Sequence, residues 1–443
     1  MRAEGRKVCD RPPVTCSGAR PTVIDLYAGA GGLSLGMEQA GFDVLVAAEM
    51  DPIHALVHRY NFPACQIVCD DLSNVTGKQL LESAAKGWIQ HHPDVPFPGA
   101  VDAVVGGPPC QGFSVGGVRD VNDARNDQLL EFVRLVVEIR PTVFCLENVA
   151  GLLESTFDKK RGEAFDLLKE AGYLLTGVNG WVDAQDFGVP QSRRRVLVLG
   201  ALGDTAPPEM RSSKTRPKVA DALMGLPDIA SYRRLLHDDE APWAHAQRPV
   251  RVAEVGPYAA TLAGLRRDPD DYSYQRDWSA NMITGSRRTI HLRRTIQRFA
   301  RTKQGAVEKK SRLFRLDPEA VAHTLRAGTG SDRGSHTSPR PIHPTKNRVI
   351  TVREAARLHA YPDWFRFHTT NWHGHRQVGN SVPPPLARAA GASLMQSLGC
   401  TPTRPEDRLL LGDPKWLRMT KKEAEAALAD LGPIARSPEK PAA

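Results

Sequence analysis

The sequence lacks any long hydrophobic run, which argues against an integral membrane protein. No apolar stretch in its 443 residues approaches the ~20 residues that a helix needs to span a bilayer. Residues 1–20 are polar and basic and have no apolar core, so they do not form a secretory signal and we expect a flexible leader there. These absences predict a cytoplasmic protein.

The sequence also lacks paired cysteines. Its seven cysteines are scattered, none forms a C-x-x-C pair, and Cys65 and Cys69 have no His or Cys partners at zinc-finger spacing. We therefore expect no metal site, and buried thiols in a reducing compartment. The hydrophobic content of 41% is enough for one large domain or two ordinary ones.

Negative charge is scarce in one part of the chain. The net charge is +9, but residues 206–346 hold 26 Lys and Arg against 15 Asp and Glu, whereas the rest holds 33 against 35. A concentrated basic segment fits a polyanionic partner, of which nucleic acid is the most common. A merely solvated basic face is the alternative.

Short β-branched runs alternate with amphipathic stretches in the first 200 residues. They predict strands at 22–28, 42–49, 101–107, 142–148 and 195–201, and helices at 32–40, 129–139 and 163–172. This alternation predicts an α/β fold with a doubly wound, mostly parallel sheet. Such sheets bind ligands in the loops beyond the carboxyl ends of their strands.

The alternation stops after about residue 200. Residues 206–285 are rich in Pro, Asp and Arg, 287–302 predict a basic helix, and 327–344 are rich in Gly, Ser and Pro. Ordered patterns return at 348–365 and 377–399. A polar tail follows from residue 400, with a short charged helix at 420–431.

A glycine turn follows the first predicted strand, in DLYAGAGGLSLG (25–36). Gly29, Gly31 and Gly32 allow a tight turn and a close approach of a ligand to the backbone. Ser34 stands where the dinucleotide fingerprint needs its third glycine. Glu49 ends the next strand, where an acid can bind the ribose hydroxyls of a nucleoside cofactor. The motif favours such a cofactor over a plain structural turn.

A stiff loop, GGPPCQGFS (106–114), follows the strand at 101–107. Its two prolines fix the backbone, and the loop presents Cys110 at the carboxyl edge of the sheet. A structural cysteine is expected inside a strand, as Cys145 is. From the loop alone, a nucleophile and a structural role for Cys110 are equally supported.

Charged residues mark two more strands. Glu147 ends the strand at 142–148, so it is expected at the same edge as Cys110, where it could share a proton with a base nitrogen. Arg193 and Arg195, in QSRRRV (191–196), are expected on one strand face and could hold a phosphate or a carbonyl oxygen. An exposed acid in a loop and a basic edge strand are the alternatives.

Together these motifs resemble the DNA (cytosine-5) methyltransferase family, and they follow in the family's order over residues 22–200 and 348–399. DLYAGAGG is similar to the family's cofactor loop, CDDL (69–72) to its adenine-contacting segment, and PPCQGFS to its nucleophile loop. The other similar segments are RNDQLLEFVR, ENV, QSRRR, TVREAARLHAYPDWF and GNSVPPPLA. The compact chain is most similar to the prokaryotic restriction-modification type.

The resemblance implies a Rossmann-like S-adenosylmethionine-dependent enzyme that flips a cytosine out of duplex DNA. Cys110 would add to carbon 6, Glu147 would hydrogen-bond or protonate ring nitrogen 3, and a base would later remove the C5 proton. Arg193 and Arg195 would anchor the flipped base and its phosphate. The implied cofactor-binding residues are Asp25, Tyr27, Ala28, Gly29, Gly31, Gly32, Leu33, Glu49, Met50, Asp71, Leu72, Pro108, Asn380 and Ser381.

The resemblance also implies domain boundaries. A catalytic domain at 21–205 would be followed by an inserted, smaller target recognition domain at 206–346, which is the basic segment. The closing motifs at 347–399 would return to the catalytic domain, and the leader 1–20 and the tail 400–443 would flank it. Double-stranded DNA would lie between the two domains. The family norm is a monomer, which can accompany a separate restriction endonuclease.

Three alternatives are weaker. A tRNA cytosine-5 methyltransferase would share the catalytic motifs, but that type usually has a CFT-type tripeptide and a compact recognition region, and neither is found here. A non-catalytic DNA-binding module would be expected to lose Cys110 or Glu147. The missing third glycine argues against a nicotinamide-dependent oxidoreductase.

Overall fold

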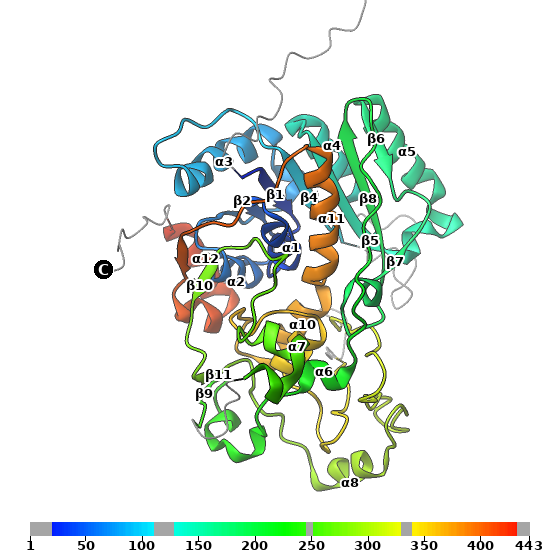
Figure 1. Ribbon diagram of the computed structural model, residues 1–443, viewed down its shortest axis with the longest axis vertical. Helices are drawn as coiled ribbons and strands as arrows, with labels where there is room; N and C mark the ends of the chain where they lie inside the picture. Colours follow the sequence, from blue (N-terminus) through cyan, green and yellow to red (C-terminus); the bar gives the residue numbers. More distant parts are fainter. Residues whose placement is uncertain (1–19, 110–127, 245–250, 329–338, 432–443) are drawn as a thin grey trace, which may run out of the picture.

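The computed structural model describes residues 20–109, 128–244, 251–328 and 339–431. In this part of the chain an eight-stranded sheet forms the middle layer of the upper part of the molecule (Figure 1). The order is β3-β2-β1-β4-β5-β8-β6, and β7 pairs with β8. β1 to β5 are parallel, whereas β8 is antiparallel to β5, β6 and β7. The predicted doubly wound, mostly parallel sheet is confirmed. The bounds are β1 Thr22–Leu26, β2 Asp43–Ala48, β3 Gln66–Val68, β4 Ala103–Gly106, β5 Val143–Val149, β6 Tyr173–Thr176, β7 Val182–Asp183 and β8 Arg194–Leu202.

Helices cover both faces of the sheet because its strands are apolar on both sides. Val23 of β1 packs into a core shared with α1 and α11, whereas the next residue, Ile24, packs into a second core shared with α3 and α4. A Cβ on Gly36 of α1 would lie 2.2 Å from Ala387 of α11, so glycine lets these two helices approach closely. The bounds are α1 Gly32–Ala40, α2 Pro52–Asn61, α3 Gly77–His91, α4 Gln128–Ile139, α5 Asp158–Glu170 and α11 Pro384–Ser397.

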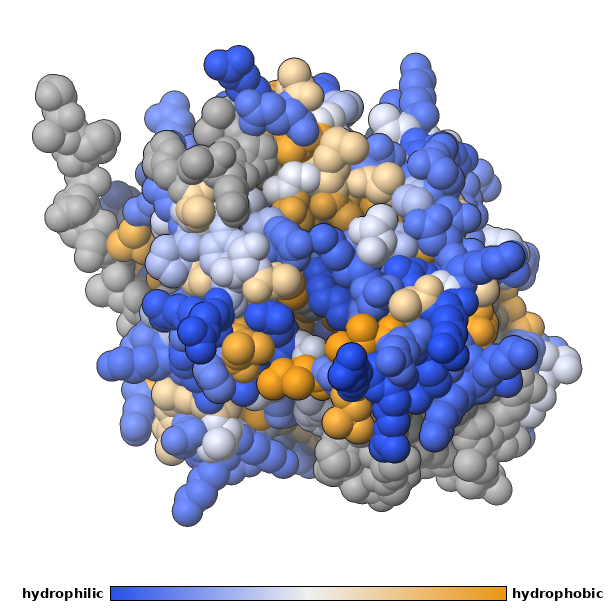
Figure 2. All heavy atoms as spheres, turned by 90° about the horizontal axis from the view of Figure 1, so that it is seen from below, coloured by the Kyte–Doolittle hydropathy of each residue, from blue (hydrophilic) through white to orange (hydrophobic). Residues whose placement is uncertain are grey.

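The described residues of 206–346 form only short elements, in line with the loss of periodicity in the sequence, and much of this segment forms the lower lobe in Figure 1. Seen from below, this end of the molecule is largely hydrophilic, with hydrophobic groups scattered over it (Figure 2). The predicted basic helix is shorter than expected, because the residues before Arg293 are not helical. The bounds are α6 Val219–Leu223, β9 Ala241–Pro242, α7 Val252–Leu262, β10 Gln275–Asp277, β11 Met282–Ile283 and α8 Arg293–Arg301.

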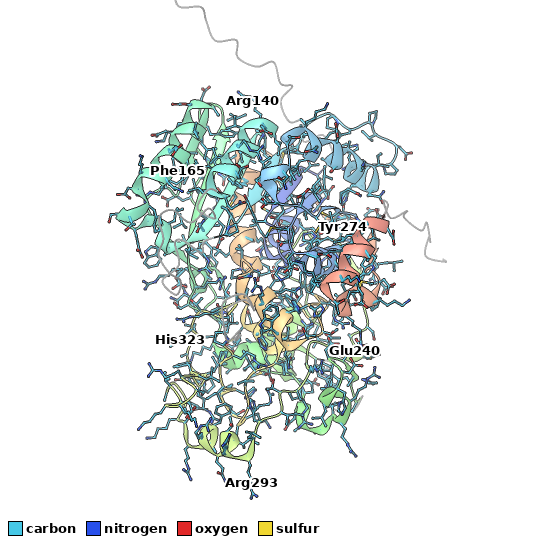
Figure 3. All side chains as sticks on the ribbon, turned by 180° about the vertical axis from the view of Figure 1, so that it is seen from behind. Arg140, Phe165, Glu240, Tyr274, Arg293 and His323 are labelled. Atoms are coloured by element: carbon cyan, nitrogen blue, oxygen red, sulfur yellow. The ribbon has the colours of Figure 1, made fainter. Side chains whose placement is uncertain are left out.

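One stretch of this segment, residues 268–277, lies along the sheet domain and not in the lower lobe. The guanidinium group of Arg276 donates to both carboxylate oxygens of Glu38 in α1, at 2.9 Å each. The hydroxyl of Tyr274 donates to Asp43 of β2 at 2.9 Å. Figure 3 accordingly shows Tyr274 beside the upper helices and Arg293 at the opposite end of the molecule. β10 also pairs with the tail strand β12 (Arg408–Leu410).

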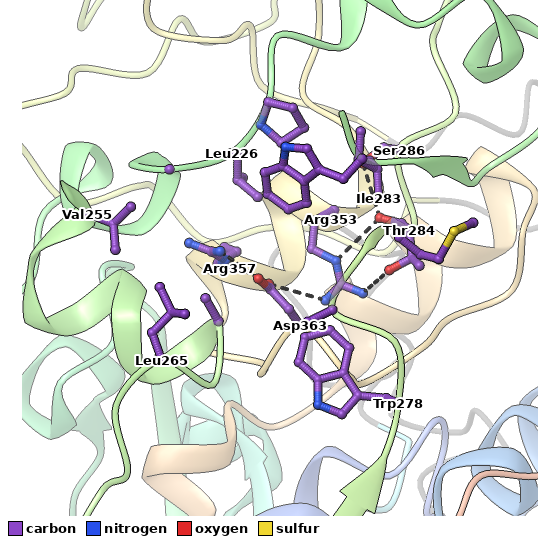
Figure 4. Close-up of a pocket in the computed structure, with 16 residues that line it drawn as sticks. Leu226, Val255, Leu265, Trp278, Ile283, Thr284, Ser286, Arg353, Arg357 and Asp363 are labelled. Carbon is purple, nitrogen blue, oxygen red and sulfur yellow. Dashed lines mark hydrogen bonds and ion pairs between the residues drawn. The ribbon is translucent and has the colours of Figure 1, made fainter. Parts of the chain in front are cut away.

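The lower lobe is joined to α9 (Val352–Leu358) by buried arginines around a small pocket (Figure 4). Arg353 donates to the side chain of Thr284 at 2.9 Å and to the carbonyl oxygen of Phe365 at 2.8 Å. Arg357 donates to the carbonyl oxygens of Ala222 and Met224 in the lobe, at 3.2 Å each, and is held by both carboxylate oxygens of Asp363, at 2.7 and 2.6 Å. Burial lowers the pKa of Arg353 to about 10, which leaves its charge in place at neutral pH. These contacts fix the lobe to the segment that continues into α10 (Asn371–Asn380).

The last described part of the chain, around residues 416–431, packs against α2. The helix predicted at 420–431 is α12 (Lys421–Asp430), and its Ala424 lies in a small core with Ile53 and Leu56 of α2. The backbone N–H of Thr369 donates to the carbonyl oxygen of Leu417 at 2.9 Å, which ties this end to the segment before α10. None of the helices in the described ranges is long and apolar enough to cross a membrane.

Candidate active site

The glycine turn between β1 and α1 is packed on one side and open on the other. Gly29 and Gly31 have φ of 57° and 102°, the left-handed region that favours glycine. A Cβ on Gly31 would lie 2.4 Å from the ring of Phe62, whereas a Cβ on Gly29 would meet nothing within 4 Å. Ala28 and Leu33 are buried, so they can offer a ligand only backbone atoms. A ligand can therefore approach the backbone at Gly29.

Asp25 lies under this turn. Its side chain is fully buried, Ser34 Oγ donates to its Oδ2 at 2.5 Å, and Nε2 of His58 lies 2.8 Å from the same hydroxyl. Burial raises the pKa of Asp25 to about 7 and lowers that of His58 to about 3. The resemblance implies a cofactor contact for Asp25, but the structure places its carboxyl group below the turn, where it supports the start of α1 through Ser34.

The buried Asp25 carboxyl predicts a pH-dependent part of the stability. Folding raises its pKa from an ordinary value of 3.8 to about 7, so its contribution is fully present below about pH 4 and is lost as the pH rises towards 7. We expect the free energy of unfolding of the wild type, relative to Asp25→Asn, to fall across this window by up to about 1.4 kcal/mol per pH unit. Urea unfolding from pH 4 to 7.5 measures it. A difference that does not change with pH would contradict it.

The carboxylate of Glu49 is fixed beside the open side of the turn. The backbone N–H of Gly29 donates to its Oε2, and the N–H of Asp51 donates to its Oε1, both at 2.9 Å. The next side chain, Met50, is 66% exposed. A held carboxylate can accept hydrogen bonds from a ribose diol, and an exposed apolar side chain next to it offers a surface for a base.

Three other residues that were expected to bind the cofactor, Tyr27, Asp71 and Leu72, lie farther along the same edge of the sheet. The hydroxyl of Tyr27 donates to the carbonyl oxygen of Gln128 in α4 at 3.0 Å, and burial raises its pKa. Asp71 caps the short helix Leu72–Asn74 by accepting from the N–H of Ser73 at 3.0 Å. Leu72 is buried, so its side chain supports this helix from the core.

The segment after α10 lies directly on the start of α1. A Cβ on Gly32 would lie 2.4 Å from the carbonyl oxygen of Val382, 2.4 Å from the hydroxyl of Tyr361 and 3.0 Å from Cβ of Ser381. Asn380 is exposed at the end of α10. The fold thus brings Asn380 and Ser381 to the glycine turn, which lies far from them in the sequence.

Glu147 of β5 and Arg195 of β8 form an ion pair two strands away from the turn. Arg195 Nε lies 2.7 Å from Glu147 Oε1, and each side chain is 12% exposed. A Cβ on Gly107 would lie 2.9 Å from Glu147 Oε2, and the side-chain amide of Asn148 donates to the carbonyl oxygen of Pro108 at 3.4 Å. The carboxylate therefore stands beside the chain that leads to the predicted nucleophile, Cys110, which lies outside the described residues. Pro108 itself is buried and braces this chain.

Arg193 is placed differently from the prediction. It is 1% exposed, and its guanidinium group donates to the carbonyl oxygens of Leu325, Gly379 and Ser381 at 3.1, 2.9 and 3.0 Å. A guanidinium group enclosed by carbonyl oxygens has no free face for a phosphate. Arg193 thus joins the start of β8 to the segment after α10, and only Arg195 of the expected pair reaches the site.

The order of the strands sets these groups in one row. Glu49 follows β2, the glycine turn follows β1, Pro108 follows β4, and Glu147 and Arg195 lie on β5 and β8. This row runs along the carboxyl ends of the parallel strands, where such sheets bind ligands. In the described ranges, no group of three or more His, Cys, Asp or Glu side chains is arranged to hold a metal ion.

Two buried residues of this region were not anticipated from the sequence. Nε2 of Gln191 donates to Nδ1 of His359 at 2.9 Å, and the opposite ring nitrogen lies 3.0 Å from the carbonyl oxygen of Ser381. Burial lowers the pKa of His359 well below its ordinary value, so the ring is neutral and donates from Nε2. Neither residue has a local signal in the sequence, because both bonds join segments that meet only in the fold.

Fold and site together define an α/β protein with an open glycine turn and an acid–arginine pair on the same edge of its sheet. Comparison with known proteins gives the family. The family model for C-5 cytosine-specific DNA methylase matches residues 21–396, so the chain belongs to that family. It is a DNA (cytosine-5) methyltransferase, as the order of its motifs predicts.

Individual relatives agree with this membership. The chain is 44% identical to the Type II methyltransferase M.XorII of Xanthomonas oryzae pv. oryzae, over 92% of each chain. It is 32% identical to M1.HphI of Haemophilus parahaemolyticus, over 85% of this chain and 87% of the relative. Among solved structures, a putative DNA modification methyltransferase from an E. coli prophage matches with a TM-score of 0.67 and 33% identity, over 86% of this chain and 99% of that one.

Proposed function

We propose that this enzyme transfers a methyl group from S-adenosylmethionine to carbon 5 of a cytosine in one short sequence of duplex DNA. The observation that carries the proposal is the row that sets the open glycine turn and Glu49 beside the Glu147–Arg195 pair. S-adenosylmethionine is a nucleoside and supplies an electrophilic methyl group when bound. Glu49 would accept from its ribose hydroxyls, Met50 and Asp71 would flank the adenine, and Asn380 and Ser381 would meet the amino-acid end.

The charged pair fits the chemistry that a cytosine ring requires. Carbon 5 is a poor nucleophile until carbon 6 is saturated, so the Cys110 thiolate forms a bond to carbon 6 while Glu147 holds a proton at ring nitrogen 3 to receive the electrons. Arg195 keeps Glu147 in place. Carbon 5 would take the methyl group from the bound cofactor, which would leave as a neutral thioether, and the proton on ring nitrogen 3 would return to Glu147. A base then removes the C5 proton, the C5–H electron pair forms the C5=C6 double bond, and the C6–S bond breaks with its electron pair on sulfur, which regenerates the Cys110 thiolate.

Residues 206–346 are proposed to recognise the DNA. Their excess of positive charge and their short, irregular elements suit a surface that follows a phosphate backbone. The relatives named as Type II methyltransferases support a place in a prokaryotic restriction-modification system, where the enzyme would act in the cytoplasm as a monomer. A separate endonuclease would cut the same site when it is unmethylated.

The direct test follows the methyl group. Purified protein is incubated with duplex DNA and tritium-labelled S-adenosylmethionine, and the product is mapped by bisulfite sequencing. We expect label at carbon 5 of cytosine in one short context. Glu49→Gln should need roughly tenfold more cofactor for the same rate, because a charged acceptor has been lost. Label on tRNA but not on DNA, or methylation without sequence context, would contradict the proposal.

A further inference from the structure

Helix α8 carries positive charge on its exposed face. Arg293, Arg294 and Arg301 are exposed and have no carboxylate partner among the described residues, whereas Arg298 lies 3.3 Å from Glu308. In a helix each residue is turned by about 100° from the one before. Arg293, Arg294 and Arg301 therefore project on the side opposite the buried ring of Phe299.

Apolar side chains are exposed on and beside the same helix. Ile290, Leu292 and Ile296 are 77, 64 and 41% exposed, and Ile290 is the most exposed large hydrophobic residue in the described part of the chain. Figure 1 places α8 at the far end of the lower lobe, and Figure 2, which looks onto that end, shows hydrophobic groups between strongly hydrophilic ones. These exposed apolar side chains are therefore available to contact a partner.

The buried face of α8 is packed against the rest of the lobe. Phe299 is 1% exposed and packs with Ile342 and Val349, and the ring of His291 meets it edge-on at 5.2 Å between ring centres. Val349 lies two residues before Thr351, which caps α9. The exposed face of α8 is therefore presented by a rigid support that continues into the helix next to the site.

The side chains at the centre of the exposed face of α8 are of the types that recognise base edges in DNA. Gln297 lies four positions after Arg293, so the two project together, with Ile296 on one flank and Arg294 on the other. Arginine binds guanine and glutamine binds adenine through paired hydrogen bonds, and an apolar side chain can meet the thymine methyl group. An acidic protein surface would match the arginines, but it would leave Gln297 and the apolar groups without a specific partner.

We infer that α8 enters the major groove of the target duplex and reads part of its sequence. Arg293 and Gln297 contact base edges, Ile296 meets an apolar base edge, and Arg294 and Arg301 bind the flanking phosphates. The nine-residue helix is about 13 Å long, and the major groove, about 12 Å wide, admits a helix. This inference rests on the proposed function, since it assigns part of the DNA recognition in residues 206–346 to one helix.

The test distinguishes the recognition of particular base pairs from the general attraction between arginine side chains and DNA phosphates. Arg293→Ala and Gln297→Ala are assayed on a library of duplexes randomised around the preferred site, with methylation mapped by bisulfite sequencing. We expect each variant to lose preference at one or two base pairs, by roughly tenfold or more, while the other positions keep theirs. Alanine favours a helix at exposed positions, so thermal unfolding should match the wild type. Wild-type site preference in both variants would overturn the inference.

A second pair of substitutions measures the phosphate contacts. Arg294→Gln combined with Arg301→Gln should weaken binding to every duplex and reduce the slope of log affinity against log salt by about 2. The control, Lys421→Gln with Lys422→Gln in α12, should leave that slope unchanged. An unchanged slope in the α8 pair would overturn the phosphate contacts. If the wild type methylates no DNA, the proposed function fails and this inference with it; if all variants share the wild-type preference and salt slope, only this inference fails.

Discussion

Glu147→Gln is expected to lower kcat by roughly 10²- to 10⁴-fold, the range for the loss of a positioned acid–base group. The amide keeps the size of the side chain but cannot deliver a proton to ring nitrogen 3. It also removes the partner of Arg195, now 2.7 Å from the carboxylate. Cofactor binding should stay close to wild type, because Glu147 lies on β5, two strands from the glycine turn after β1. Single-turnover methylation and equilibrium cofactor binding measure the two effects separately.

Two further variants serve as references for the effect of Glu147→Gln. Cys110→Ser should lower the rate at least as far, since the hydroxyl is a far weaker nucleophile than a thiolate. Glu170→Gln, at an exposed position of α5, should behave as wild type. If Glu147→Gln keeps the wild-type kcat while Cys110→Ser loses it, the proton on ring nitrogen 3 comes from another group. If both lose cofactor binding, the effect is on folding, and thermal unfolding will show it.

Local patterns in the sequence predict the sheet well. The strand and helix expected at 22–28 and 32–40 correspond to β1 and α1, and the apolar run at 129–139 corresponds to α4. These elements are buried against the two cores, so burial and local periodicity favour the same structure. The helices α2 and α3 were not predicted.

Contacts between distant segments could not be predicted. The bond between Arg276 and Glu38 places residues 268–277 on the sheet domain, although their composition matches that of the lobe around them. A charged side chain in a sequence predicts exposure, because burying an unpaired charge is costly. Here buried acceptors compensate the charge, and their identity depends on the fold. For the same reason Arg193 was predicted to bind the substrate, whereas the structure places its side chain in the interior of the protein.

Arg193→Ala is expected to lower the free energy of unfolding by about 3–5 kcal/mol. The substitution leaves the carbonyl oxygens of Leu325, Gly379 and Ser381 without their charged donor in a buried place, and buried acceptors without partners are costly. An arginine that anchored a DNA phosphate would give the opposite pattern: nearly unchanged stability, weaker DNA binding and a smaller salt slope. Urea unfolding and DNA binding at several salt concentrations distinguish the two roles.

The adjacent residue is the matched control. Arg194 begins β8 with its side chain exposed, and its guanidinium group lies 4.1 Å from the centre of the Trp181 ring. Arg194→Ala should therefore cost only about 1 kcal/mol. Arg193→Lys should recover little stability, because one ammonium group cannot reach three carbonyl oxygens that a planar guanidinium group spans. Since Ser381 adjoins the glycine turn at Gly32, cofactor affinity should fall together with stability in both Arg193 variants. If the Arg193→Ala protein is as stable as the wild type, binds the cofactor with wild-type affinity and has a reduced salt slope in DNA binding, Arg193 contacts a DNA phosphate and this prediction is wrong.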